Sequence, residues 1–170
     1  MSPDLAEFQA RLLAYFSGEK RESLLFLLAG PGAMAGAAAL WRGGGPWRGM
    51  IAPLALVGAI QIAVGGSVFL RTDRQVSDLS ARLPEDARGL RADETARMAA
   101  VMRSFKVYKA VEVAILAAGV LLALIFPYGS ALHAAGAGCL LQGGLTLVLD
   151  LLAEGRGHDY VAALSRLTPT

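Results

Sequence analysis

A block of charge set between two long apolar halves is the feature that most constrains how this chain folds. The block runs from Arg71 to Lys109 and holds nine of the sixteen basic residues and six of the fourteen acidic residues. The segments on either side have the pattern of apolar hairpins, and 55% of the chain is hydrophobic, more than a soluble domain of 170 residues can bury. We therefore predict a membrane protein whose two halves are joined by one charged bridge.

Four apolar segments are long enough to cross a lipid bilayer. A helix of about twenty residues, rising about 1.5 Å per residue, crosses a hydrocarbon core of about 30 Å. The sequence therefore predicts an all-α fold, a polytopic membrane protein that forms a single four-transmembrane-helix bundle. The predicted spans are residues 23–41, 50–70, 107–126 and 131–152.

The remaining segments carry apolar residues at helical spacing, which predicts short amphipathic helices outside the spans. We expect the first helix to end at Gly18 and the tail to bend at Gly155 and Gly157, since glycine commonly ends a helix. In the bridge we expect a polar helix to continue from the second span over residues 71–80, Pro84 to break it, and a helix from Asp93 to run straight into the third span, so that the bridge forms a helical hairpin. The segments concerned are residues 1–22, 71–106 and 153–170.

The distribution of Lys and Arg predicts the orientation of the chain. Four spans put both termini and the bridge on one side, together with fourteen of the sixteen basic residues. Only Arg42 and Arg48 lie on the other side. Because positive residues favour the cytoplasmic side, we expect an inner-membrane protein with both termini in the cytoplasm.

Four polar residues fall inside the predicted spans. Glu112 and Asp150 enter the third and fourth spans at similar depth, and Gln61 and Gln142 lie near the middle of the second and fourth. A charge at the centre of a span costs about 2.5–3.5 kcal/mol on insertion scales, so these residues form a candidate intramembrane polar site.

Two interpretations of this site stay open. In the first, the carboxylates bind protons or cations at the inner mouth of a pathway. In the second, Glu112 pairs with Lys109 or Arg71, Asp150 reaches the membrane surface, and the glutamines form hydrogen bonds between helices.

An apolar stripe on the bridge is a candidate interaction surface. Met98, Met102, Phe105 and Tyr108 share one face at helical spacing. The N-terminal helix, the C-terminal tail, a partner or lipid headgroups must cover this stripe. Methionine-rich apolar surfaces adapt readily to partners.

Strips of small residues indicate where helices can approach closely. Gly32 and Gly36 form one strip in the first span, and Ala110, Ala114 and Ala118 form another in the third. Packing within the bundle and contact with a second chain are both compatible with such strips.

The sequence lacks the residue patterns of common enzymes and metal sites. Asp150, Glu154 and His158 recur every four residues, but the glycines between them predict a break that would separate them as metal ligands. Cys139 is the single cysteine and forms no intrachain disulfide. We expect no catalytic residues, no metal, no cofactor and no nucleic-acid partner.

These features favour a non-catalytic protein that binds membrane lipid and another membrane protein, a membrane-inserted polypeptide or a second copy of itself. In overall plan, with both ends inside and short outer loops, the chain is similar to the four-span immunity proteins that protect bacteria from pore-forming toxins. Accessory subunits of membrane complexes share this plan. The alternative is an oligomeric channel or small transporter that uses Glu112 and Asp150.

Overall fold

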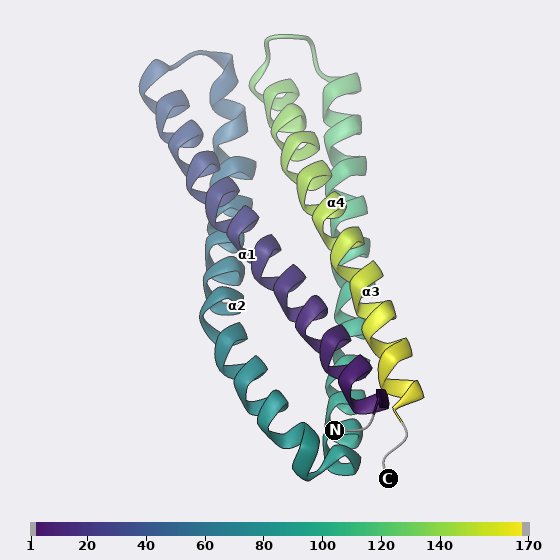
Figure 1. The fold of residues 1–170 in the computed structure, drawn as a ribbon. Helices are drawn as coiled ribbons and strands as arrows, with labels where there is room; N and C mark the ends of the chain where they lie inside the picture. Colours follow the sequence, from purple (N-terminus) through teal and green to yellow (C-terminus); the bar gives the residue numbers. More distant parts are fainter. Residues whose placement is uncertain (1–2, 168–170) are drawn as a thin grey trace.

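The computed structural model describes residues 3–167, which form four long α-helices and no strand (Figure 1). Each long helix is apolar and long enough to cross a membrane, which confirms the prediction of an all-helical chain with four such segments. The elements are α1 (Pro3–Gly43), the 3₁₀ helix η1 (Pro46–Met50), α2 (Ile51–Glu85), α3 (Ala87–Ile125) and α4 (Ala131–Arg166).

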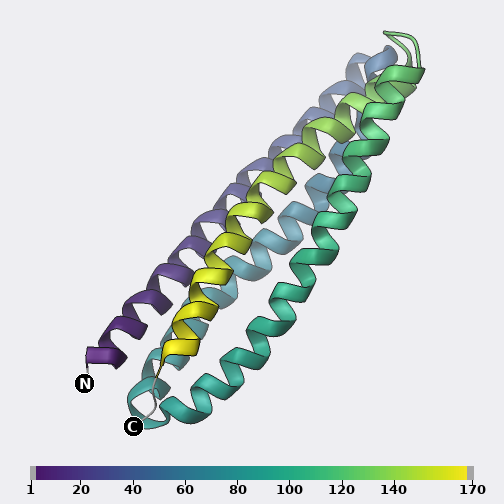
Figure 2. The same ribbon diagram turned by 90° about the vertical axis from the view of Figure 1, so that its right-hand side faces the viewer.

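The helices pair as two antiparallel hairpins, α1 with α2 and α3 with α4. Helix α4 joins the hairpins because it also packs against α1, α2 and η1 along its length. Helix α3 meets α2 near their shared turn and reaches α1 through side chains near the polar end, where Arg97 lies over the Phe16 ring. Figures 1 and 2 show that α2 and α3 meet at their shared turn and diverge beyond it. The bundle is therefore closed around α4 and open between α2 and α3.

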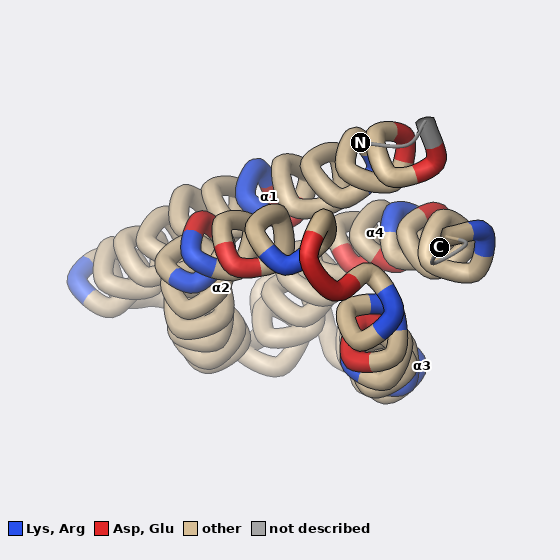
Figure 3. The backbone as a smooth tube through the Cα atoms, turned by 60° about the horizontal axis from the view of Figure 1, so that its bottom comes forward, with Lys and Arg blue, Asp and Glu red and all other residues tan. Residues whose placement is uncertain are grey.

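Charged residues gather at one end of the bundle. Both ends of the chain and the turn between α2 and α3 lie at this end, which we call the polar end (Figure 3). The opposite end, which we call the loop end, carries η1 and the turn at residues 126–130. The charged bridge is thus the α2–α3 turn together with the helical segments leading into it.

The helices are about twice as long as a membrane span. The four helices have 35–41 residues and measure roughly 50–60 Å, whereas the hydrocarbon core of a membrane is about 30 Å thick. The predictions of a separate short helix near the N-terminus and of another in the tail are therefore wrong, because both segments continue the spanning helices without a break. The two pieces of the bridge continue their spanning helices, as the sequence predicts. The helical backbone runs through Gly18, Gly155 and Gly157.

Close packing explains why two of these glycines do not end their helices. A Cβ atom at Gly18 would lie 2.5 Å from the Arg156 side chain, and one at Gly157 would lie 2.9 Å from the sulfur of Met102. At both positions a side chain of another helix lies against the glycine and would have to shift to admit a Cβ atom. Sequence spacing alone does not distinguish this use of glycine from a helix end.

The predicted break near Pro84 is confirmed. Helix α2 ends at Glu85, and Asp86 caps α3 by accepting a hydrogen bond from the Gly89 backbone N–H at 2.8 Å. This tight turn connects the two hairpins at the polar end.

The core of the polar end consists of large apolar side chains from all four helices. Phe8, Tyr15, Phe16 and Tyr160 stack in one aromatic group, with ring centroids 4.6–6.2 Å apart. The whole cluster of buried residues comprises Phe8, Leu12, Tyr15, Phe16, Leu79, Leu83, Leu90, Met98, Tyr160, Leu164 and Leu167.

Small residues replace these large side chains farther along the bundle. Gly30 faces Gly58 between α1 and α2, and Gly119 faces Gly136 between α3 and α4, each against the partner's backbone carbonyl. The small-residue strips predicted from the sequence do not make these close contacts. Gly32 has no neighbour that a Cβ would meet, and the strip of Ala110, Ala114 and Ala118 is exposed.

Candidate functional site

A cavity of about 500 Å³ lies between the helices where the predicted spans meet the polar end. All four helices line it, and its wall combines apolar with charged side chains. Its inner part lies within the predicted spans, at Phe26, Val64 and Asp150, and its outer part lies at the level of Glu19 and Arg97. The charged lining residues are Glu19, Glu22, Arg71, Arg97, Asp150 and Arg156, and the larger apolar ones are Phe26, Val64, Val68, Val101, Phe105 and Tyr108.

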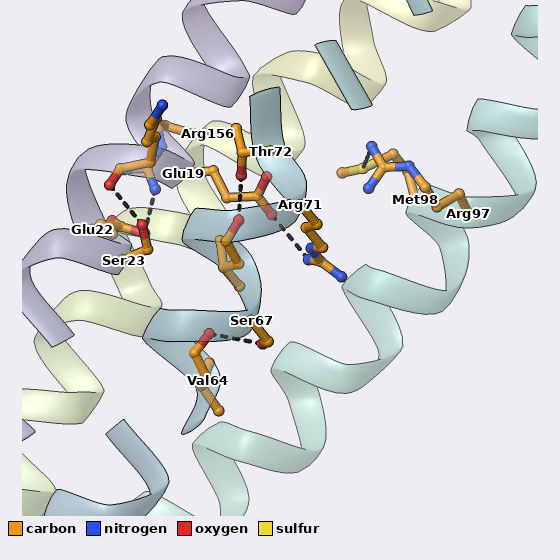
Figure 4. Close-up of polar contacts among 12 residues, drawn as sticks. Glu19, Glu22, Ser23, Val64, Ser67, Arg71, Thr72, Arg97, Met98 and Arg156 are labelled. Atoms are coloured by element: carbon orange, nitrogen blue, oxygen red, sulfur yellow. Dashed lines mark hydrogen bonds and ion pairs between the residues drawn. The ribbon is translucent and has the colours of Figure 1, made fainter. Parts of the chain in front are cut away.

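Ion pairs between helices surround this cavity. Arg71 of α2 donates to Glu19 of α1 at 3.3 Å, and Arg156 of α4 pairs with Glu22 of α1 (Figure 4). Lys20 also pairs with Asp73, at 2.5 Å, and links α1 to α2 near the cavity. These pairs connect α1 to both α2 and α4, but none of them reaches across to α3.

Glu19 carries an electrostatic cost in this arrangement. Burial raises the pKa of its carboxyl group above the ordinary value of 4.5, and the charge of Arg71 opposes this shift without cancelling it. One carboxylate oxygen of Glu19 is buried and has no hydrogen-bond partner among the described residues. The ion pair with Arg71 therefore offsets only part of the cost of burying the Glu19 carboxylate.

The structure brings Glu112 and Asp150 together. Glu112 is 8% exposed, and its carboxyl group lies within hydrogen-bonding reach of Asp150 on the facing helix α4. The predicted pairings of Glu112 with Lys109 or Arg71 are wrong. Lys109 instead donates to Glu154 at 2.5 Å, and Arg71 is occupied by Glu19.

The two central glutamines also meet, as the sequence predicts for hydrogen bonds between helices. The Gln61 side-chain amide of α2 donates to the Gln142 side-chain oxygen of α4 at 3.2 Å, and both residues are buried. This contact joins the two hairpins in the middle of the bundle. The structure thus groups the four polar residues into two facing pairs.

The apolar stripe of the bridge divides into a buried part and an accessible part. Met98 is fully buried in the polar-end core, and Met102 packs partly buried against it. Phe105 is half-buried and Tyr108 is 53% exposed, and both line the cavity. The N-terminal helix and the C-terminal segment cover the buried part, which was one of the predicted alternatives.

A buried polar group at the polar end was not identified from the sequence. Arg97 donates two hydrogen bonds to Glu94, at 2.7 and 2.8 Å, and the Tyr160 hydroxyl donates to the same carboxylate at 3.0 Å. Burial and the nearby Glu94 raise the pKa of Tyr160, so its phenol stays neutral. The sequence shows that Glu94 and Arg97 are about one helical turn apart. Tyr160, which completes the group, lies 66 positions from Glu94 and could not be identified from local spacing.

The expectation that a helix break separates Asp150, Glu154 and His158 is wrong, because α4 is continuous. These residues do lie on one helix, and His158 is 4.0 Å from Glu154. Even so, no group of three or more metal-ligating side chains in residues 3–167 is arranged to hold a metal ion.

Aromatic residues collect at the loop end of the bundle. Trp47 contacts Tyr128 edge-on with ring centroids 6.3 Å apart, and Tyr128 contacts His133 in the same way at 5.3 Å. Trp41 is largely exposed and lies beneath the Arg48 guanidinium. Exposed tryptophan and tyrosine are typical of a membrane surface.

Comparison with known proteins adds no family: no protein-family model matches the chain, and no curated protein or solved structure is significantly similar to it.

Proposed function

We propose that this chain is a non-catalytic inner-membrane protein, with both termini in the cytoplasm, that binds another membrane protein or a membrane-inserted polypeptide. The observation that carries the proposal is the open side of the bundle between α2 and α3. In a closed four-helix bundle each helix packs along two neighbours, whereas α3 packs along its length against α4 and meets α1 and α2 near the polar end. A large part of its surface is therefore left for another molecule.

The proposed orientation rests on charge and topology. The turn between α2 and α3 lies beside both ends of the chain, so the charged bridge and the basic residues near the termini share the polar end (Figure 3). An excess of Lys and Arg favours the cytoplasmic side of a membrane.

The side chains that line the cavity favour a partner whose surface is mostly apolar and also carries some polar groups. Phe105 and Tyr108 offer aromatic surface beside the charged groups of Arg71 and Asp150. Tyrosine and arginine are enriched where protein partners bind, because each combines apolar area with hydrogen-bonding groups. A transmembrane or amphipathic helix with small apolar and polar side chains fits this description.

The exposed strip on α3 gives such a helix a second place to pack. Ala110, Ala114 and Ala118 repeat every four residues and are exposed, so another helix can approach the α3 backbone closely there. This strip and the cavity lie on different sides of α3.

A site-specific photo-cross-linking experiment tests the proposal. A photoreactive amino acid at position 108 should form an adduct with a foreign membrane polypeptide in native membranes. The matched control is position 25, because Leu25 is similarly exposed, at 48% compared with 53% for Tyr108, but lies on α1 and does not line the cavity. The same polypeptide should co-purify in stoichiometric amount and be lost in Tyr108→Ala.

The other outcomes of that experiment are equally informative. An adduct with a second copy of the chain would make the partner a homo-oligomer. Adducts with lipid alone, together with a purified chain free of other polypeptides, would contradict the proposal.

Transport of protons or cations is the second candidate, and the facing carboxyl groups of Glu112 and Asp150 favour it. The polar residues on this route reach only as far as Gln61 and Gln142. Beyond them, Gly138 packs directly against Pro53 between α4 and α2. A complete pathway would thus need a second chain, and proton flux into vesicles holding only this protein would favour transport.

A further inference from the structure

Helix α4 carries a line of polar residues from the polar end into the middle of the bundle. Gln142, Thr146, Asp150 and Glu154 recur every four residues on a helix that has no break between them. Residues at this spacing lie on one face, and the line is about 18 Å long at 1.5 Å per residue. It runs from the ion pair at Glu154 to the buried glutamine pair.

Glu112 faces this line from α3. Its carboxyl group lies within hydrogen-bonding reach of Asp150, yet its Oε2 atom is buried and has no hydrogen-bond partner in the described part of the chain. Two ionised carboxylates cannot hydrogen-bond to each other, because both are acceptors. One proton on the pair supplies the missing donor.

The neighbouring charges do not neutralise this pair. The cations on the same two helices close to the pair in sequence each bind another carboxylate: Lys109 of α3 binds Glu154, and Arg156 of α4 binds Glu22 of α1. Arg71 of α2 binds Glu19 in the same way. Glu22 and Glu154 also act on Asp150 as like charges. The pair is therefore surrounded by matched ions and has no cation of its own.

Buried side-chain atoms elsewhere among the described residues show the same imbalance. Five such atoms have no hydrogen-bond partner: four are acceptor oxygens, on Glu19, Glu22, Gln61 and Glu112, and one is a donor nitrogen, on Arg156. A buried acceptor without a donor costs about 1–3 kcal/mol, and more when it is charged. The region thus lacks hydrogen-bond donors, which protons and water supply.

We propose that Glu112 and Asp150 form a proton-binding site that holds one shared proton and exchanges it with the polar end through the cavity. Asp150 lines the cavity of about 500 Å³, which supplies the route for exchange. Among the described residues, no third His, Cys, Asp or Glu joins the pair to hold a metal ion, and the Thr146 hydroxyl lies beside Glu112. The site does not depend on partner binding.

Infrared difference spectroscopy on the full chain in lipid vesicles tests this proposal. A protonated carboxyl group has a carbonyl-stretching band that ionised carboxylates lack. We expect such a band at neutral pH, its loss as pH rises, and its absence in both Glu112→Gln and Asp150→Asn. The matched control is Asp78→Asn, which changes an exposed carboxylate of α2 and should leave the band unchanged.

A second measurement on the unaltered chain keeps the proposal testable if a variant does not fold. Hydrophobic carbodiimides modify protonated carboxyl groups, so mass spectrometry should find the label on Glu112 or Asp150, with less labelling at high pH. Absence of both the band and the label at neutral pH would overturn the proposal. A band that sodium ions remove at constant pH would also overturn it, in favour of a cation site.

Discussion

The polar end and the spanning part of the bundle are held together by different means. At the polar end, Leu12, Phe16 and Tyr160 are no more than 1% exposed and form a core like that of a soluble protein. In the spanning part, the closest contacts are made by Gly30 against Gly58 and by other small residues. The same four helices thus change their packing along their length.

The surroundings proposed for each part explain the difference. Where water surrounds the helices, burial of large apolar side chains stabilises the bundle by about 25 cal/mol per Å². Where lipid surrounds them, an apolar side chain gains little by turning inward, so close backbone packing and hydrogen bonds between helices must hold the fold. The Gln61–Gln142 contact is one such hydrogen bond.

The largest effect should come from removing an aromatic side chain at the polar end. Phe16→Ala should lower the free energy of unfolding by about 3–5 kcal/mol, because it leaves a cavity in a fully buried cluster. Unfolding in mixed detergent micelles, followed by circular dichroism, measures this change. Leu28→Ala is the control, since Leu28 is 72% exposed and should change stability little.

A smaller but clear loss should follow a change in the spanning part. Gly30→Ala places a methyl group 2.7 Å from the Gly58 carbonyl oxygen, so α1 and α2 must separate. Such overpacking costs about 1–3 kcal/mol. Gly32→Ala adds the same methyl group two residues away in open space and should be neutral. Equal effects of the two variants in the same unfolding assay would refute the contact.

The smallest effect should be a pH dependence at the polar end. The raised pKa of Glu19 means that the folded chain keeps a proton at pH values where the unfolded chain has lost it. Stability should therefore fall as pH rises from about 4.5 through the folded pKa, and Glu19→Gln should reduce this fall. Melting temperatures across a pH series measure it, with Asp78→Asn expected to behave as the unaltered chain. A series in which Glu19→Gln matches the unaltered chain at every pH would contradict this assignment.

The sequence by itself determined the four helices and the turn at Pro84, because apolar length and helix-breaking residues are local signals. It also determined that Gln61, Gln142, Glu112 and Asp150 require partners, since polar groups in an apolar segment are costly.

Only the tertiary structure decided which partners these residues have. Lys109 binds Glu154 instead of Glu112, and Gly18 packs against Arg156 instead of ending its helix. Each outcome depends on where a second helix crosses the first, which is set by packing between segments far apart in the chain. A local pattern cannot encode that crossing, so the pairing of Glu112 with Asp150 and the open side beside α3 became visible only in the folded bundle.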